Sequence, residues 1–346
     1  MGVSTAYYLA KRGASDVLLL ERDLLAQATT GLSVGGIRQQ FSHPANILLS
    51  QQSVEVFKNF KKEFGIDIHF RQPGYLFLAQ KEETWNDLLS GVQTQRRLNV
   101  PVEILSPGEI KKSWSYLNIA DIQGGTFGPE DGYADPYLTS VGFANQARKL
   151  GVRIEEKTEV TGIRIKEGRL QGVITSRGPV STPVIVNAAG PWGGKIARMA
   201  GLDLPMKPYR RQVFCTKPFA EIPKPVPMVI DQDLTFYFRG EESSILMGMS
   251  DPDEPSSFNT HIDRDFLERV IDAAVHRAPV LAKAEYLRGW GGLYTITPDD
   301  NPIIGEAPGQ KVFSVSSAFQ GTAFNRVLLS ARLSASSSLI DEQILT

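Results

Sequence analysis

The sequence of 346 residues contains very little cysteine and histidine. Its single cysteine, Cys215, excludes an internal disulfide framework and a cysteine-rich metal site. The four histidines are scattered, without the spacing of metal ligands. A sequence so poor in cysteine is typical of a reducing compartment. We therefore expect a cytoplasmic protein with no metal centre.

The sequence also lacks an excess of positive charge and any long hydrophobic run. Its 37 Lys and Arg residues are balanced by 38 Asp and Glu residues, which argues against nucleic acid as a partner. No apolar run approaches the roughly 20 residues that span a bilayer. The N-terminus does not have the pattern of a signal peptide. Hydrophobic residues make up 42% of the chain, enough to bury a sizeable core.

The N-terminal segment carries half of a dinucleotide-binding pattern. Gly2 opens a helical pattern, and the apolar strand Val17–Leu20 follows it and ends at Glu21. In the dinucleotide fingerprint, an acidic residue at this spacing binds a ribose hydroxyl. The first two glycines of the fingerprint would lie upstream of Met1, so we expect the first strand to be missing from the chain. An ordinary αβ unit, with Glu21 as a solvated charge, is the alternative.

Four segments of the chain share the pattern of a known family. They are Gly2–Arg22, Thr30–Phe41, Val186–Trp192 and Trp290–Gly305. In this order they resemble the DAO-type FAD-dependent oxidoreductases, which include sarcosine oxidase, dimethylglycine dehydrogenase, glycine oxidase and the proline dehydrogenase β subunit. The second and fourth segments resemble the loops that pass the flavin, and the third resembles a second nucleotide contact. Beyond Phe324 the resemblance stops.

The pattern of elements predicts an α/β fold, α+β overall, with two interleaved domains. Apolar runs beside helical patterns indicate a Rossmann-like domain. Alternating patterns indicate an antiparallel sheet. By the resemblance, the first domain binds FAD and the second binds the substrate. We place the FAD-binding domain at 1–45, 137–205 and 285–346, and the substrate domain at 46–136 and 206–284.

The resemblance implies a set of FAD-binding residues. They are Gly2, Glu21, Arg22, Thr30, Ser33, Gly35, Gly36, Ile37, Val160, Ala188, Gly190, Trp192, Gly292, Leu293, Gly321 and Thr322. Gly35 and Gly36 have no Cβ, so their backbone can approach a cofactor closely. Trp192 could equally be core packing. The places where some relatives tether the flavin resemble Ala28 and Gly292, which carry no nucleophile, so we expect non-covalent FAD.

Four residues are expected to act on the substrate or on the flavin. Arg38 would place a positive charge beside a ring whose reduced form is an anion; a surface ion pair is the alternative. Tyr237 and Arg239 could bind a substrate carboxylate, or form a packed strand face. Tyr294 is expected to point toward the same place.

We predict from this resemblance an enzyme that oxidises the C–N bond of a small amino acid or N-methyl amine to an imine. The run Gly36–Phe41 resembles the sarcosine oxidase β and proline dehydrogenase β members most, so sarcosine or proline is the expected type of substrate. The absence of an arginine at Tyr294 argues against primary D-amino acids. The acceptor would be oxygen or an electron-carrier protein. Three alternatives stay open: a glycine or D-amino-acid oxidase, a nicotinamide dehydrogenase, and a truncated chain without cofactor.

Overall fold

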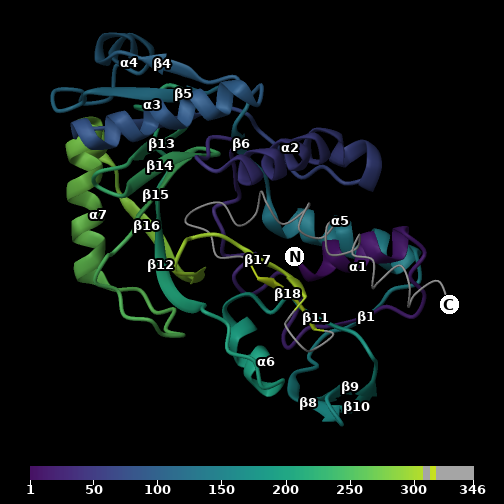
Figure 1. Cartoon of the computed structure of the whole chain (residues 1–346). Helices are drawn as coiled ribbons and strands as arrows, with labels where there is room; N and C mark the ends of the chain where they lie inside the picture. The colour runs from purple at the N-terminus through teal and green to yellow at the C-terminus, as the bar shows by residue number, and fades with distance from the viewer. Residues whose placement is uncertain (307–311, 317–346) are drawn as a thin grey trace.

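The computed structural model describes residues 1–306 and 312–316. Gly321 and Thr322, two of the expected cofactor contacts, lie outside the described residues. The described part folds into two halves, one rich in helices around short parallel strands and one built on a large sheet (Figure 1). No helix in residues 1–306 is long and apolar enough to cross a membrane.

The first half contains two small sheets with parallel pairing. β1 (Leu18–Leu20) pairs in parallel with β7 (Arg153–Glu155). β11 (Ile185–Asn187) pairs in parallel with β18 (Val312–Ser316), whose other neighbour, β17 (Ile303–Glu306), is antiparallel. A separate antiparallel sheet in this half consists of β8 (Val160–Lys166), β9 (Arg169–Thr175) and β10 (Gly178–Ser181).

Three helices cover the parallel strands and form the core of this half. They are α1 (Gly2–Lys11), α2 (Pro44–Phe64) and α5 (Pro136–Lys149). Aromatic rings hold them together, and the ring centres of Phe64 on α2 and Phe143 on α5 are 4.6 Å apart. The short helix α6 (Gly193–Met199) follows β11 after the 3-10 turn Gly190–Trp192.

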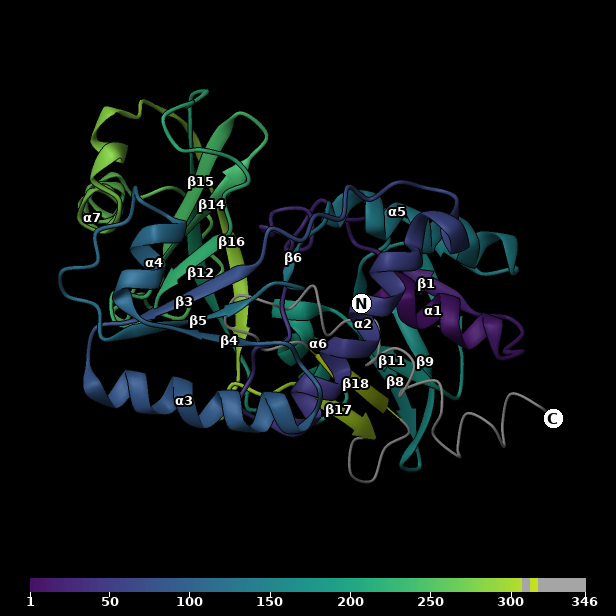
Figure 2. The same ribbon diagram turned by 90° about the horizontal axis from the view of Figure 1, so that it is seen from above.

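The second half is an eight-stranded sheet in the order β16-β12-β15-β14-β13-β3-β5-β4. All its pairs are antiparallel except β13 with β3. Its strands are β3 (Tyr75–Ala79), β4 (Glu103–Leu105), β5 (Gly124–Gly128), β12 (Lys207–Thr216), β13 (Met228–Asp231), β14 (Phe236–Glu241), β15 (Ser244–Met249) and β16 (Tyr286–Ile296). Helices α3 (Glu82–Arg97), α4 (Pro107–Ser113) and α7 (Arg264–Arg277) accompany this sheet, as Figure 2 shows, and the 3-10 turn Pro279–Lys283 follows α7.

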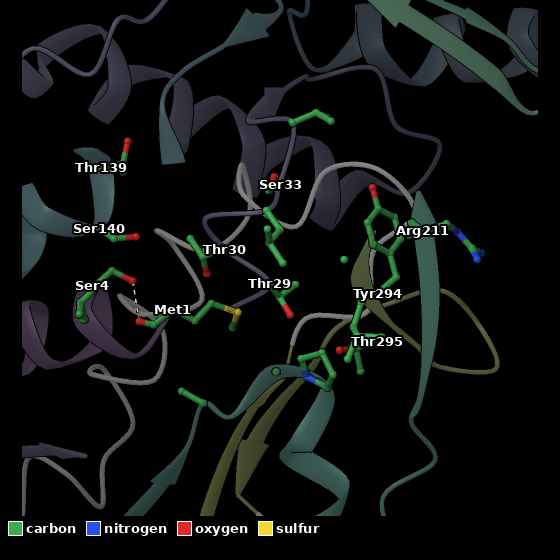
Figure 3. Close-up of a pocket in the computed structure, with 18 of the residues that line it drawn as sticks. Met1, Ser4, Thr29, Thr30, Ser33, Thr139, Ser140, Arg211, Tyr294 and Thr295 are labelled. Carbon is green, nitrogen blue, oxygen red and sulfur yellow. Dashed lines mark hydrogen bonds between the residues drawn. The ribbon is translucent and has the colours of Figure 1, made fainter. Parts of the chain in front are cut away.

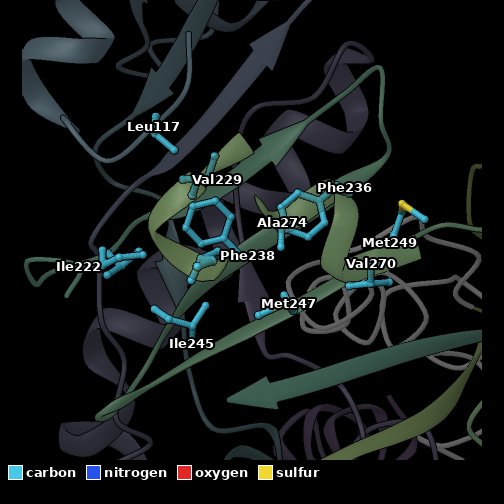
Figure 4. Packing of buried hydrophobic residues seen from close by; sticks show 14 of the residues in the cluster. Leu117, Ile222, Val229, Phe236, Phe238, Ile245, Met247, Met249, Val270 and Ala274 are labelled. Atoms are coloured by element: carbon cyan, nitrogen blue, oxygen red, sulfur yellow. The ribbon is translucent and has the colours of Figure 1, made fainter. Parts of the chain in front are cut away.

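Strand alternation divides this sheet into a core face and a face toward the first half. Phe236 and Phe238 on β14 pack with Val270 of α7 in a large apolar cluster (Figure 4). Tyr237 lies between them in sequence and therefore points to the other face, because successive side chains of a strand alternate. It packs there with Val213 of β12. The sheet thus presents its second face to the first half of the molecule.

Two segments pack differently from the domain limits that we predicted from sequence. Helix α2 was placed in the substrate domain, but it packs with α1 and α5 of the nucleotide-binding half. Strand β16 was placed in the FAD-binding domain, but it is the edge strand of the large sheet and pairs with β12 over ten residue pairs. Burial explains both differences, because each element follows the partner that covers its apolar face.

Candidate active site

A cleft lies between the two halves, and its walls come from both. It encloses about 1160 Å³ of empty space, with the open space at its mouth included. Its lining residues extend from the start of α1 to strands β12, β14 and β16 of the large sheet, an extent that suits an elongated ligand. Figure 3 shows hydroxyl side chains grouped around Met1 at one end of the cleft, and Arg211 with Tyr294 at the other.

The first end of the cleft is lined with hydroxyl groups near the N-terminus of α1. These groups belong to Ser4, Thr29, Thr30, Thr139 and Ser140. The N-terminus of a helix carries partial positive charge and favours anions. No Asp or Glu is among the lining residues within the described chain. This end of the cleft is therefore suited to phosphate groups.

The turn after β11 brings backbone to the cleft wall. The Asn187 side chain shapes this turn, since its Nδ2 donates to the Gly193 carbonyl at 2.8 Å and its Oδ1 accepts from the Ala189 N–H at 3.3 Å. Gly190 has φ +51°, and a Cβ added there would meet no atom within 4 Å. Ala188 and Gly190 both line the cleft, so a ligand can approach the backbone there without a side chain in the way.

The second end of the cleft is formed by the large sheet. Tyr237 on β14, Arg211 on β12 and Tyr294 on β16 line it together with apolar side chains. Gly248 of β15 lies opposite Tyr237 in the sheet, and a Cβ at Gly248 would lie 2.5 Å from the Tyr237 hydroxyl. The missing side chain at position 248 therefore lets the phenol ring lie across the sheet toward β12. Burial raises the pKa of Tyr237 well above its usual value, so it remains a neutral hydrogen-bond donor.

Two adjacent arginines on β12 have opposite environments. Arg210 Nε and Nη2 donate to the Glu254 carboxylate at 2.9–3.1 Å, which neutralises its charge. Arg211 faces the cleft, its guanidinium 5.6 Å from the centre of the Tyr294 ring. Within the described residues, Arg211 donates to the Arg210 carbonyl at 2.9 Å, and its buried Nε has no acceptor. Arg211 was not predicted from the sequence, although alternation along β12 requires that one of the two arginines faces the cleft.

Arg38 is half-buried behind the second end of the cleft rather than among its lining residues. Its guanidinium lies over the rings of Phe41 and Phe77, at 4.5 and 5.1 Å from their centres. Desolvation lowers the pKa of Arg38, and electrostatic interactions with Tyr75, Asp131 and Tyr294 partly offset this effect. Arg38 therefore does not line the cleft, but it interacts electrostatically with Tyr294, which does.

Arg239 is directed away from the cleft. Its Nη2 donates to the Val34 carbonyl at 2.9 Å, and its Nη1 forms an ion pair with Glu241. It is buried, it is not among the cleft-lining residues, and its guanidinium lies 4.0 Å from the centre of the Tyr133 ring. These contacts make Arg239 a support for the loop that carries Val34. The role expected for Arg239, to bind a carboxylate, fits Arg211 better.

The other expected cofactor residues fall into three groups. Those that line the cleft are Thr30, Ser33, Ala188, Gly190, Gly292 and Leu293. Those that line a second, adjoining hollow are Arg22, Trp192 and again Leu293. The Arg22 guanidinium lies 4.4 Å from the centre of the Trp192 ring. Those outside both hollows are Gly2, Glu21, Gly35, Gly36, Ile37 and Val160.

Of this last group, Glu21 and the glycine loop have identifiable roles. Glu21 Oε1 accepts the Asp23 N–H at 2.9 Å at the end of β1. Gly36 and Ile37 form β2, which pairs with β6 (Gly132–Tyr133) behind the cleft-lining Ser33 and Val34. Val160 begins β8 and pairs with Thr175. Trp192, which lines the second hollow, stacks on Phe258 with ring centres 5.5 Å apart.

The donor groups of the cleft fit a dinucleotide and do not fit a metal ion. Hydroxyl groups and a helix terminus lie at one end, backbone without large side chains lies in the middle, and Arg211 with two tyrosines lies at the other end. No group of three or more His, Cys, Asp or Glu residues that could hold a metal occurs in the described ranges. The only cysteine of the chain, Cys215, is buried in β12 and is not among the residues that line the cleft.

Comparison with known proteins agrees with this geometry. The family model of the FAD dependent oxidoreductases matches residues 1–337. The mitochondrial sarcosine dehydrogenase of Mus musculus is 30% identical over 342 residues, which cover 94% of this chain and 36% of the mouse protein. The mitochondrial dimethylglycine dehydrogenase of Rattus norvegicus is 29% identical over 340 residues, 92% of this chain and 39% of the rat protein. The chain thus spans somewhat more than a third of the length of these two relatives.

A solved structure gives the same result over nearly its full length. The L-proline dehydrogenase from P. horikoshii superposes with a TM-score of 0.88 at 31% sequence identity, and the match covers 96% of this chain and 89% of that protein. The resemblance found in the sequence and the predicted fold class are therefore confirmed. The chain belongs to the DAO family of FAD-dependent oxidoreductases.

Proposed function

We propose that this chain binds FAD in the cleft and oxidises the C–N bond of a small secondary amino acid, of the sarcosine or proline type, to an imine. The observation that carries the proposal is Arg211, a guanidinium that faces the cleft and has no carboxylate partner in the described residues. Arg211 is half-buried at the cleft wall, and a substrate carboxylate would supply the counter-charge that it lacks among the described residues.

FAD, when bound, would accept two electrons and a hydrogen from the substrate carbon. The hydroxyl end of the cleft would hold its phosphates, and the end near Tyr294 would hold its ring. A ring held there would lie near Arg211 and Arg38, which both interact with Tyr294. The expected attachment is non-covalent, since Ala28 and Gly292 carry no nucleophile.

The protein's own side chains would orient the substrate rather than deprotonate it. Arg211 would bind the carboxylate, and Tyr237 would donate a hydrogen bond as a neutral phenol. The described lining contains no Asp, Glu, His or Lys that could act as a general base. The amine must therefore arrive neutral, and we expect the rate to rise with pH through the effective pKa of the substrate amine. The N–H proton then leaves as the imine forms.

The names of two relatives support the secondary-amine preference, because sarcosine dehydrogenase and L-proline dehydrogenase are named for secondary amines. Dimethylglycine dehydrogenase is named for a tertiary amine. The electron acceptor, oxygen or an electron-carrier protein, stays a prediction. The cytoplasmic location expected from composition stays a prediction, and both mammalian relatives are described as mitochondrial.

Mixing the oxidised enzyme with amines in the absence of oxygen tests the proposal. Sarcosine and proline should each bleach the visible absorption of the oxidised flavin. Glycine and a D-amino acid should bleach it far more slowly. Rapid bleaching by glycine or the D-amino acid, with both secondary amines inactive, would overturn the assignment and favour a glycine oxidase-like enzyme.

A further inference from the structure

A buried carboxylate lies directly behind the loop that lines the cleft. Asp131 precedes β6, and its side chain is only 1% exposed. β6 pairs with β2 in a register that sets Gly36 opposite Tyr133 and Ile37 opposite Gly132. The next pair in this register places Asp131 opposite Arg38. The Asp131 carboxylate is therefore a cross-strand neighbour of the cation expected to act on the flavin.

The contacts of Asp131 hold the segment that follows β2. Its Oδ1 accepts the backbone N–H of Gln39 at 2.8 Å, and its Oδ2 accepts Gln40 Nε2 at 3.1 Å. Gln40 also donates to the Tyr75 carbonyl at 3.1 Å, and its Oε1 accepts Thr126 Oγ1 at 3.0 Å. This network ties β2 to two strands of the large sheet, β3 and β5, and all its members are buried.

The position of β6 leaves Asp131 little freedom to move. Gly132 is so close to the segment at Arg71 that a Cβ there would lie 1.8 Å from the Arg71 carbonyl oxygen. The Gly74 N–H donates to the Asp131 carbonyl at 3.0 Å, and Tyr133 exchanges two backbone hydrogen bonds with Arg71. These contacts hold the Asp131 carboxylate in one position, so its charge lies at a constant position relative to Arg38.

We propose that Asp131 is a positioning residue that holds the segment Gly36–Phe41 against the cleft, and that its ionisation modulates the positive field of Arg38 at the cofactor ring. The second part of this proposal depends on the proposed function only for the position of the flavin ring near Tyr294. The residues that carry it are otherwise independent of the substrate.

The charges around Asp131 set the direction of the effect. Burial raises the pKa of Asp131 to about 7, while hydrogen bonds from Gln40 and Gln39 and the charge of Arg38 oppose this rise. The titratable or charged groups that face it from other elements are Arg38 and Tyr75, and burial keeps Tyr75 neutral. Above pH 7 the carboxylate should therefore offset part of the Arg38 charge, and the flavin should become harder to reduce.

A pH titration of the bound flavin tests this inference without substrate. The absorption spectrum of the wild-type holoenzyme should change between pH 5.5 and 9, with a midpoint near 7. Asp131→Asn keeps the shape of the side chain and should abolish that transition, and its flavin should have a higher reduction potential than wild type at pH 8. Asp231→Asn removes another fully buried carboxylate, which pairs with Arg277 at 2.7 Å, and should leave the transition intact. A wild-type spectrum without the transition, or one that persists in Asp131→Asn, would overturn the proposal.

Thermal unfolding of the cofactor-free protein provides a second, independent measurement. A carboxyl group with a raised pKa holds its proton in the folded state between about pH 4 and 7, where the unfolded chain has lost it, so its contribution to stability falls as pH rises through that window. The Tm of wild type should therefore fall relative to the Tm of Asp131→Asn as the pH is raised from 4 to 7. A difference in Tm that does not depend on pH would contradict the ionisation of Asp131.

A second variant serves if Asp131→Asn does not fold. Thr126→Val removes only the outer hydrogen bond to Gln40 and should shift the midpoint of the spectral pH transition away from the wild-type value. An unshifted midpoint would count against the network.

Discussion

Arg211→Met should lower kcat/KM for an amino-acid substrate by roughly 10²- to 10³-fold. Loss of one partner from a buried, hydrogen-bonded charge pair costs about 2–5 kcal/mol, and each 1.4 kcal/mol is about tenfold. The loss should appear mainly in KM, since the carboxylate is remote from the C–N bond that reacts. Steady-state kinetics with sarcosine and proline, at fixed FAD saturation, measures this effect. Arg211→Lys should restore part of the activity, because the charge is kept and the bidentate geometry is lost.

The neighbouring residue provides a matched control. Arg210→Met removes the same side chain from the same strand, but it breaks the pair with Glu254 on the side away from the cleft. This variant should be less stable and yet retain the wild-type KM. A normal kcat/KM in Arg211→Met, or a larger rise in KM in Arg210→Met, would show that the carboxylate binds elsewhere.

Gly35→Ala should weaken FAD binding by at least tenfold and lower the stability of the protein. Gly35 has φ +67°, and a Cβ there would lie 2.1 Å from the Ala134 carbonyl oxygen. The left-handed conformation alone costs a residue with a side chain about 1–2 kcal/mol. The clash adds to this cost and must move the adjacent Ser33 and Val34, which line the cleft. Titration of the apoprotein with FAD, followed by flavin fluorescence, measures the affinity.

A second glycine, Gly65, provides a control that separates the cost of a left-handed backbone from the displacement of the cleft-lining loop. Gly65 ends α2 with φ +75°, and a Cβ there would meet no atom within 4 Å. Gly65→Ala should therefore cost about 1–2 kcal/mol in stability and leave FAD affinity unchanged. Equal FAD affinities in the two alanine variants would mean that the loop around Gly35 does not set the shape of the cofactor site.

The sequence predicts the local elements of this fold well, because their signals are local. The Ser106-Pro107 pair predicts the start of α4, and the structure confirms it with a capping box between Ser106 and Glu109. The turn before Pro136 is followed by α5, which Asp135 caps through the Leu138 N–H at 2.9 Å. The strand at Val17–Leu20 is present as β1 and ends before Glu21, as expected.

The site was only partly predictable, because it depends on contacts between distant residues. Tyr237 and Arg239 lie on a strand that corresponds to the substrate sheet of the family, and this correspondence suggested a joint role. The Arg239 side chain instead contacts Val34 and Glu241. The alternation of side chains along a strand does not predict these contacts. Asp131 lies in a turn that its sequence predicts, and turns are usually solvated. Asp131 is buried because β2 and residues 71–74, which are distant in sequence, pack around it.

We expect the flavin in this cleft to remove two electrons from the C–N bond of a secondary amino acid. A single-turnover experiment without oxygen tests it most directly: proline is mixed with an excess of holoenzyme, flavin reduction is followed by absorbance, and the cyclic imine is trapped and quantified with an aromatic amino-aldehyde. We expect one imine for each flavin reduced in both proteins, and at the same low proline concentration we expect flavin reduction to be roughly 10²- to 10³-fold slower in Arg211→Met than in wild type. Flavin reduction without an equal amount of imine, or an equal rate in the variant, would contradict this mechanism.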